Sequence, residues 1–329
     1  MVPYVIRRLT LMVFLLLVLS VVTFALFNAV PTDPARLTCG KTCTPEIVAA
    51  NRVRLGLDKP ITMQYLDWFK AIFVGRDFGS GTQTFRCNAP CLGYSFKNGE
   101  QVTVLIKNAL PVTVYLAIGA FVMWMAGGVL SGLYAAKHRG KWQDRTIMST
   151  ALFLYSLPVF LVAFVLLIFV VVRWKLLPYP DYTSPFDNPI QFFLTMILPW
   201  IALAELYAAY YTRLTRSQML ETMSEDFIRT ARAKGLPEKV VVRRHALRAG
   251  LTPIVTSAGL DLAGLLGGAV ITEYVFSLPG LGRLAINSVK DYDLPMLTAT
   301  TLLAASFIIV ANILVDVLYA AIDPRVRLT

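Results

Sequence analysis

The 329-residue sequence contains only two histidines, His138 and His245, and they lie far apart. A histidine-based metal site is therefore not expected. The GxxxxGK[S/T] loop that binds nucleotide phosphates is missing, as are the HExxH and GxSxG motifs of hydrolases. The apolar segments also offer no pair of side chains that could act as a nucleophile and its base. We expect no catalytic residue, no metal site and no bound cofactor on this chain, which is not an enzyme by itself.

Charged residues are scarce as well. They make up 16% of the chain, whereas hydrophobic residues make up 56% and the mean hydropathy is +0.61. This composition is typical of a polytopic membrane protein and excludes an ordinary soluble protein. Six apolar runs are each long enough to cross about 30 Å of hydrocarbon as a helix. They cover residues 9–27, 102–136, 146–172, 190–215, 251–276 and 295–322.

The first apolar run follows Arg7 and Arg8, which is also the pattern of a signal peptide. The run is long for a signal sequence, and no A-x-A cleavage site follows it. We therefore expect residues 1–30 to be a retained transmembrane helix. The predicted fold is an all-α membrane protein with six transmembrane helices.

Residues 31–100 differ from the rest of the chain because they are rich in proline, glycine and charged residues. We predict a small extracytoplasmic subdomain here, with short amphipathic helices at 45–55 and 61–73. A core of five spans at 101–322 and a cytoplasmic tail at 323–329 would follow.

All four cysteines lie in the predicted outer subdomain, as the C-x3-C pairs Cys39/Cys43 and Cys87/Cys91. An even number of cysteines in a disulfide-permissive compartment predicts two disulfide bonds. Three connectivities are possible, and spacing alone does not choose among them. Metal binding is the alternative, but C-x3-C without a nearby histidine is a weak zinc pattern.

Positive charge is unevenly distributed along the chain, whose net charge is +11. When the six spans are counted through the membrane, one side receives most of the basic residues and few of the acidic ones. This bias follows the positive-inside rule, so we expect both termini and the loop at 217–250 to be cytoplasmic. The charge therefore reports membrane topology, and nucleic acid is not an expected partner.

The loop at 217–250 carries the signals of a helical hairpin. Thr222 and Glu225 fit a capping box, in which the two side chains satisfy free backbone N–H groups reciprocally. Gly235 can take the left-handed conformation that ends a helix, and Pro237 suits the first turn of the next one.

We predict a first helix from about Ser224 to Lys234 and a second that ends near Arg248. An ordered hairpin on the wet side of a membrane protein favours a docking surface over a simple solvated loop. A DNA-reading helix-turn-helix has a similar pattern, but a hairpin held at the membrane by both ends is poorly placed to enter a groove.

A second irregular segment, residues 277–294, follows the fifth apolar run. Pro279, Gly280 and Gly282 come directly after the run, and a short apolar stretch precedes the last span. We predict a turn and a half-buried re-entrant helix on the outer side, with an ordinary interfacial loop as the alternative.

Four acidic residues lie within or at the ends of the predicted spans, where buried acids usually face a bundle interior, an aqueous path or a partner. Glu273 and Asp316 lie near span ends and suit an interfacial position. Asp261 lies in mid-span, close to glycines that permit close helix approach or a shaped cavity. Both structural packing and a translocation path fit this pattern. The candidate path residues are Glu205, Asp261, Gly264, Gly267 and Gly268.

Longer motifs resemble a known family. The stretch EDFIRTARAKG at 225–235, with RHALR at 244–248, closely resembles the cytoplasmic loop of ABC importer permeases in the peptide and nickel branch. The stretch GGAVITEYVFSLPGLG at 267–282 is similar to the same branch around its fifth helix and the following loop. The general importer signature begins Glu-Ala-Ala, and Arg229-Thr230-Ala231 here is the form typical of the peptide branch. The resemblance spans essentially the whole chain.

The resemblance implies a transmembrane permease subunit of an ATP-driven importer of di- or oligopeptides in a bacterial inner membrane. ATP and magnesium would be bound by two partner ATPase subunits or one fused ATPase. A second homologous permease, an extracytoplasmic substrate-binding protein and the peptide would be the other partners. The implied ATPase-coupling residues are Glu225, Asp226, Phe227, Arg229, Thr230, Ala231, Arg232, Ala233, Lys234 and Gly235. The implied binding-protein-facing residues are Pro279, Gly280, Leu281, Gly282 and Arg283.

Three alternatives remain at this point. An importer of nickel or another small solute shares the same motifs. A proton-coupled secondary peptide transporter would use Glu205 or Asp261 as a proton relay, but the chain has a docking hairpin and no internal repeat. A membrane-embedded scaffold would need no path at all.

Overall fold

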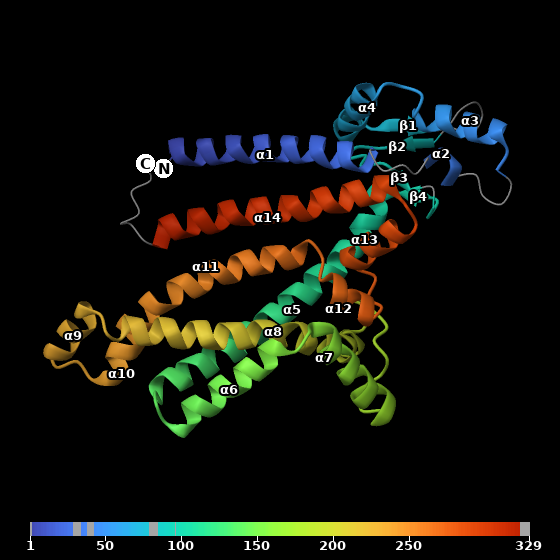
Figure 1. Ribbon diagram of the computed structural model, residues 1–329. Coiled ribbons are helices and arrows are strands. Elements are labelled where there is room, and N and C mark those ends of the chain that lie inside the picture. The colour runs from blue at the N-terminus through green and yellow to red at the C-terminus, as the bar shows by residue number, and fades with distance from the viewer. Residues whose placement is uncertain (1, 29–33, 38–42, 79–84, 96, 323–329) are drawn as a thin grey trace. The chain divides into compact units, whose positions relative to one another are not determined.

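The computed structural model describes every residue except 1, 29–33, 38–42, 79–84, 96 and 323–329. The predicted tail at 323–329 therefore lies outside the described residues. Long helices dominate, with short strands near the N-terminal third (Figure 1). The chain divides into two compact units, and each is described by itself. The first unit contains Met1–Val112 and Pro279–Val310, and the second contains Thr113–Leu278 and Ala311–Val326.

The first unit begins with the predicted transmembrane helix, α1 (Val2–Asn28). Its Ser20 hydroxyl is hydrogen-bonded to the Tyr65 hydroxyl at 2.8 Å. Phe24 of α1 packs edge-on against Tyr65 at 5.5 Å and lies 5.9 Å from Trp68. Tyr65 and Trp68 belong to α4 (Ile61–Val74), so these contacts attach α4 to the C-terminal half of α1.

The predicted helices of the outer subdomain are confirmed as α3 (Pro45–Leu55) and α4 (Ile61–Val74), and α2 (Pro34–Leu37) precedes them. Thr44 caps α3 by accepting a hydrogen bond from the Ile47 N–H, and Gly56 ends it in the left-handed conformation with φ +72°.

Two short antiparallel hairpins complete the subdomain, and the sequence did not predict them. The hairpin of β1 (Arg76–Phe78) and β2 (Phe85–Cys87) precedes that of β3 (Tyr94–Ser95) and β4 (Glu100–Gln101). Strands of two or three residues are too short to show an alternating pattern in the sequence.

The cysteine prediction is confirmed where the structure describes it. Cys87 and Cys91 form a disulfide bond, which selects the connectivity within the second C-x3-C pair. Both cysteines are buried in a small cluster with Ala71 and Phe78. Cys43 is also disulfide-bonded, whereas Cys39 lies outside the described residues.

The remaining elements of the first unit are the start of α5 (Val102–Lys137), α13 (Leu281–Lys290) and most of α14 (Leu294–Ile322). They share a buried apolar cluster of Val102, Ile106, Ala109, Leu281, Met296 and Ala299. The helix expected within 277–294 is thus confirmed as α13.

The second unit is built around α8 (Pro189–Thr222), which packs against α6 (Trp142–Ser156), α7 (Val159–Leu166) and α11 (Leu247–Leu266). The unit also contains the rest of α5, η1 (Leu167–Arg173), α9 (Asp226–Ala233), α10 (Glu238–Val240), η2 (Val241–Ala246) and α12 (Val270–Val275).

Helices α5 and α8 approach closely because glycines of α5 face α8. A Cβ atom on Gly128 would lie 3.0 Å from the Ala208 carbonyl oxygen, and one on Gly132 would lie 2.6 Å from the Thr212 carbonyl oxygen. The Ser131 and Thr212 hydroxyls are hydrogen-bonded at 2.7 Å between the same helices. Small residues with a hydroxyl pair are a common way to pack helices in a membrane.

Five of the described helical stretches are long and apolar enough to span a membrane individually, and α6 with α7–η1 makes a sixth only as a bent pair. The expected span at 146–172 is therefore not one continuous helix, since the pair is bent by 94°. Pro158 provides the reason: it lacks an N–H group, and Leu157 before it is extended with φ −82° and ψ 128°.

The expected span at 251–276 also differs in the structure. Helix α11 ends at Leu266, and Gly268 has φ +124°, which an α-helix does not accommodate. The short helix α12 then forms separately. At the other end, α10, η2 and α11 run together as one helical stretch over Glu238–Leu266. The second hairpin helix therefore does not end near Arg248 but continues into the span.

Candidate functional site

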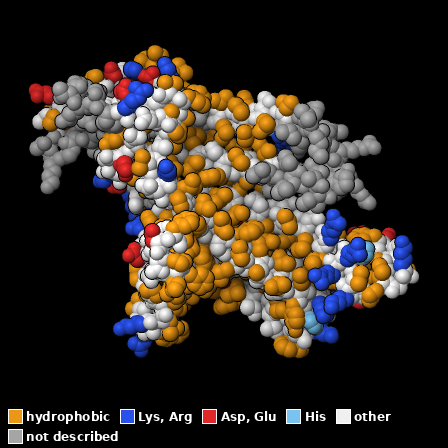
Figure 2. All heavy atoms as spheres, turned by 180° about the vertical axis from the view of Figure 1, so that it is seen from behind, with side chains coloured by type: hydrophobic (Ala, Val, Ile, Leu, Met, Phe, Trp, Pro, Cys, Tyr) orange, Lys and Arg blue, Asp and Glu red, His pale blue; other side chains and the backbone are white. Residues whose placement is uncertain are grey.

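The predicted coupling loop at 217–250 runs from the end of α8 through α9, α10 and η2 to the start of α11 in the second unit. Figure 2 shows Lys and Arg side chains gathered at this protruding end, next to helices with largely apolar flanks. Helix α9 begins at Asp226 with Glu225 as its N-cap, and no side chain caps it. The predicted capping box is wrong, because Thr222 is the buried last residue of α8 and uses its backbone carbonyl to accept from the Glu225 N–H at 3.2 Å.

The end of α9 follows the prediction. Gly235 is left-handed with φ +76°, and its N–H donates to the Arg232 carbonyl at 2.9 Å. Pro237 then caps α10. A side chain at Gly235 would strain this conformation, so glycine suits the position.

The inner face of α9 packs onto the helices on either side of the loop. Ile228 is fully buried and Ala231 is buried in a cluster with Met219 of α8, Val241 and Ala246. Ala231 therefore faces inward, although it was expected to couple to an ATPase. Ile228 was absent from the predicted residues, yet its spacing of three residues from Ala231 is the helical signal that could have found it.

The outer face of α9 carries the other predicted coupling residues. The Phe227 side chain is 46% exposed, although an aromatic ring of this size is usually buried. The exposed residues around it are Glu225, Asp226, Arg229, Thr230, Arg232, Ala233, Lys234 and Gly235. The surface is thus an exposed aromatic ring within a border of polar and oppositely charged residues.

An exposed ion pair spans the bend between the two helices of the hairpin. The Arg232 guanidinium donates two hydrogen bonds to the Glu238 carboxylate, at 3.0 and 2.7 Å. This bidentate geometry spans Gly235 and joins the end of α9 to the start of α10.

A second bidentate pair connects the turn between α5 and α6 to α8. Arg216 donates to the two Asp144 oxygens at 2.5 and 2.7 Å, and the Gly140 N–H donates to Asp144 Oδ2 at 3.0 Å. The Asp144 side chain is 5% exposed, so this pair is well shielded from solvent. The sequence did not predict this contact.

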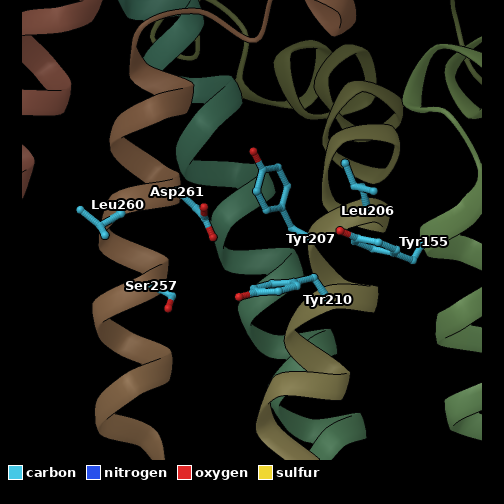
Figure 3. A pocket seen from close by; sticks show the side chains of 7 residues that line it. All are labelled: Tyr155, Leu206, Tyr207, Tyr210, Ser257, Leu260 and Asp261. Carbon is cyan, nitrogen blue, oxygen red and sulfur yellow. The ribbon is translucent and has the colours of Figure 1, made fainter.

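A pocket of about 370 Å³ lies between α6, α8 and α11 in the second unit (Figure 3). Asp261, predicted to line a path, is one of its walls, and the Tyr211 hydroxyl donates to Asp261 Oδ2 at 2.5 Å. The lining residues are Tyr155, Leu206, Tyr207, Tyr210, Ser257, Leu260 and Asp261.

The other predicted path residues do not line this pocket. Nothing lies within 4 Å of a Cβ atom added to Gly264, so its surroundings are open, whereas Gly267 and Gly268 form the break after α11. Both carboxylate oxygens of Glu205 are buried without a hydrogen-bond partner among the described residues. Glu205 and Asp261 are therefore not brought together at this pocket.

Of the two acids expected near span ends, Glu273 and Asp316, the structure describes the side-chain surroundings of Glu273. Glu273 is fully buried, and the Thr113 hydroxyl donates to its Oε1 at 2.8 Å, so its carboxylate faces neighbouring helices and not solvent. The side chain of Asp316 lies outside the described residues.

The predicted binding-protein-facing segment lies at the start of α13 in the first unit. Pro279 is exposed and Arg283 is half-buried, whereas Gly280, Leu281 and Gly282 are buried. The exposed surface of this segment lies instead on the second half of α13, at Asn287, Val289 and Lys290. Leu281 acts as a core residue, which its apolar character allows equally well.

The junction of α13 and α14 is held by Asp293. The Ser95 hydroxyl donates to its carboxylate, and the Met296 N–H donates to Oδ1 at 3.3 Å. Burial raises the pKa of the Asp293 carboxyl, although both hydrogen bonds act in the opposite direction. These bonds tie hairpin β3–β4 to the beginning of α14.

Comparison with known proteins identifies the family. The family model described as binding-protein-dependent transport system inner membrane component matches residues 128–328, and the model of its N-terminal part matches residues 1–117. The chain belongs to this family of ABC importer permeases. The permease is therefore a multi-pass inner membrane protein, and its family implies separate ATPase and substrate-binding partners.

Curated relatives cover the whole permease. It is 37% identical over 327 residues to a putative peptide transport system permease protein of Brucella abortus (strain 2308), with 99% of each chain covered. It is 35% identical over 351 residues to the dipeptide transport system permease protein DppB of Escherichia coli (strain K12), again with 99% of each covered.

A solved structure shares the fold. A chain of the MetNI methionine ABC transporter in inward-facing conformations aligns with a TM-score of 0.54 and 16% identity, covering 67% of the permease and 97% of that chain. At this identity the likeness shows the fold alone.

Proposed function

We propose that the permease is one of two homologous membrane subunits of an ATP-driven peptide importer and that α9 couples it to separate ATPase subunits. The observation that carries the coupling role is the two-sided character of α9. Ile228 and Ala231 anchor one face, while Phe227 projects from the other within a border of polar and charged residues. An exposed aromatic anchor with a charged rim is typical of a protein-binding hot spot. The relatives that cover the full chain support the peptide substrate.

In this proposal α9 transmits movement because it is fixed to two membrane helices. The buried cluster joins it to Met219 of α8, and the Arg232–Glu238 pair joins it to the stretch that continues into α11. Helices α8 and α11 also form walls of the Asp261 pocket. A push on α9 by ATP-driven closure of the ATPases would therefore reach the helices that line the path.

On the outer side, peptide would be delivered by a substrate-binding protein near α13. The exposed residues Asn287, Val289 and Lys290, together with Pro279, are the proposed contact surface. Both termini and α9 would be cytoplasmic, in keeping with the distribution of positive charge. ATP and magnesium would be bound by the partner ATPases.

The test is affinity purification of the tagged permease from native membranes in mild detergent, followed by mass spectrometry. We expect two P-loop ATPases, or one fused ATPase, and a second six-span permease. The variant Phe227→Ala should lose the ATPases, whereas Phe73→Ala should keep them, because Phe73 is exposed on α4 of the other unit. Recovery of the wild-type chain alone in every detergent would contradict the proposal.

A further inference from the structure

The pocket around Asp261 combines a carboxylate with aromatic walls, and we propose that it binds the protonated amino terminus of the transported peptide. This inference rests on the proposed peptide function and names the part of the substrate that the permease itself recognises. The pocket is built by α6, α8 and α11 within the second unit.

The carboxylate of Asp261 is held in place by a hydrogen bond but is not paired with a basic side chain of the described residues. Tyr211 is fully buried and donates to Oδ2, which fixes the orientation of the carboxylate in the pocket wall. No salt bridge joins Asp261 to a Lys or Arg in the part of the chain that the structure describes. A carboxylate inside a membrane is costly unless a cation or an aqueous site faces it. A ligand ammonium group would supply that cation.

The aromatic side chains form a pre-ordered wall for a cation. The Tyr207 ring stacks on the buried Trp124 ring at 4.6 Å, and Tyr210 packs edge-on against Tyr211 at 5.2 Å. Figure 3 shows the Asp261 carboxylate reaching from α11 toward the rings of Tyr207 and Tyr210 on α8. Aromatic faces attract ammonium groups, so the rings and the carboxylate act on the same kind of charge.

The size and remaining walls fit the end of a short peptide. A volume of about 370 Å³ is in the range of small-molecule pockets. Leu206 and Leu260 offer apolar contact for the first side chain, and Ser257 offers a hydroxyl. Asp261 is the charged residue among those that line the pocket, so the charge of the lining favours a cationic group.

The test uses a cysteine reporter in the assembled transporter, reconstituted in vesicles. Ser257→Cys places a thiol on the pocket wall, and the structure shows no free cysteine among the described residues. The thiol is treated with a small ammonium-bearing or sulfonate-bearing methanethiosulfonate reagent. Each rate is divided by the rate of the same reagent with a free thiol in solution, because the cationic reagent reacts intrinsically faster with a thiolate. We expect the corrected rates to favour the ammonium reagent roughly tenfold over the sulfonate, because the carboxylate concentrates cations. Adding Asp261→Asn should abolish this preference, whereas the matched change Asp187→Asn in an exposed outer loop should leave it intact.

Peptide protection then tests the assignment to the amino terminus. A dipeptide with a free amino terminus should slow the labelling of Ser257→Cys, and its N-acetylated form should not. A charge preference that survives Asp261→Asn, or equal protection by both peptides, would overturn the inference.

Uptake of the same dipeptide by wild-type vesicles is measured in parallel, to separate this inference from the proposed function. Uptake without protection would overturn the amino-terminal site alone. A wild-type transporter that takes up no peptide would overturn the proposed function and the inference with it.

Discussion

Ile228 and Phe227 are neighbours in α9 but have opposite environments. Ile228 is fully buried against residues of η2 and α8, whereas the Phe227 side chain is 46% exposed. Substitutions at the two residues can therefore separate the internal stability of the loop from its proposed contact with an ATPase.

Truncating each of them should have different effects. Ile228→Ala should destabilise the loop by about 2–5 kcal/mol, because it leaves a cavity in a small cluster. Phe227→Ala should change the stability of the loop little and instead reduce ATPase binding. Limited proteolysis at the α9–α10 loop and ATPase co-purification measure the two effects. Rapid cleavage of Phe227→Ala with normal cleavage of Ile228→Ala would contradict the assigned faces.

The two bidentate ion pairs should also differ in their contribution to stability. The Asp144 and Arg216 side chains are 5% and 28% exposed, whereas those of Arg232 and Glu238 are 41% and 57% exposed. Asp144→Asn weakens the charge-assisted hydrogen bonds to Arg216, which is partly exposed, and should cost about 1.5–3 kcal/mol. Glu238→Gln breaks an exposed pair and should cost less than about 1 kcal/mol. Thermal unfolding of the detergent-purified transporter compares them, and equal losses would contradict this difference.

At the scale of elements, the end of α9 depends on the left-handed conformation of Gly235, which a proline substitution would disrupt. Proline cannot adopt φ +76° and would also remove the N–H that donates to Arg232. We expect Gly235→Pro to abolish ATPase coupling while membrane insertion stays normal. Gly99→Pro is the matched control, since Gly99 is also left-handed, with φ +69°, but lies beside β4 in the first unit. Normal ATPase co-purification and ATP-dependent uptake with Gly235→Pro would count against α9 as the docking element.

Several elements could be predicted because their signals are local. Helix α3 has its cap at Thr44 and its stop at Gly56, and α9 has its stop at Gly235. The long apolar runs of α1, α5, α8 and α14 exceed the length that a bilayer requires.

The features that were missed depend on tertiary packing. Thr222 is a good cap in isolation, but a Cβ atom on Gly250 would lie 3.3 Å from its hydroxyl, so α11 packs onto it as part of α8. The burial of Ile228 requires Val241 and Ala246, which come from the second helix of the hairpin. The bend of 94° at Pro158 allows α6 and α7 both to pack on α8. Proline in the sequence indicates that a helix can break there, but it does not predict the angle of the bend.

The pocket around Asp261 was predicted only in part, because it too depends on tertiary packing. Asp261 was found because an acid in mid-span is rare, and the structure places it in a pocket wall. Its partner Tyr211 and the tyrosines around it were not found, because aromatic residues are common in any membrane helix. Glu205 gave the same signal as Asp261 yet does not line the pocket.

At the scale of the whole molecule, the disulfide bonds bear on the compartment in which the subdomain at 31–100 lies. Cys87 and Cys91 are bonded and Cys43 is disulfide-bonded as well. A membrane-impermeant thiol reagent should therefore label no cysteine in the native, unreduced protein. Labelling of intact spheroplasts should appear after reduction, if the subdomain is extracytoplasmic. A free thiol before reduction would contradict the two-bridge assignment.

The central claim is that this permease moves peptide only when partner ATPases act on it. The most direct test is uptake of a labelled dipeptide by vesicles that contain the complete transporter and its binding protein. The account predicts uptake that requires ATP hydrolysis, persists when a protonophore collapses the proton gradient, and is lost in Phe227→Ala. Uptake that continues without ATP and stops with the protonophore would contradict the account and indicate a proton-coupled secondary transporter.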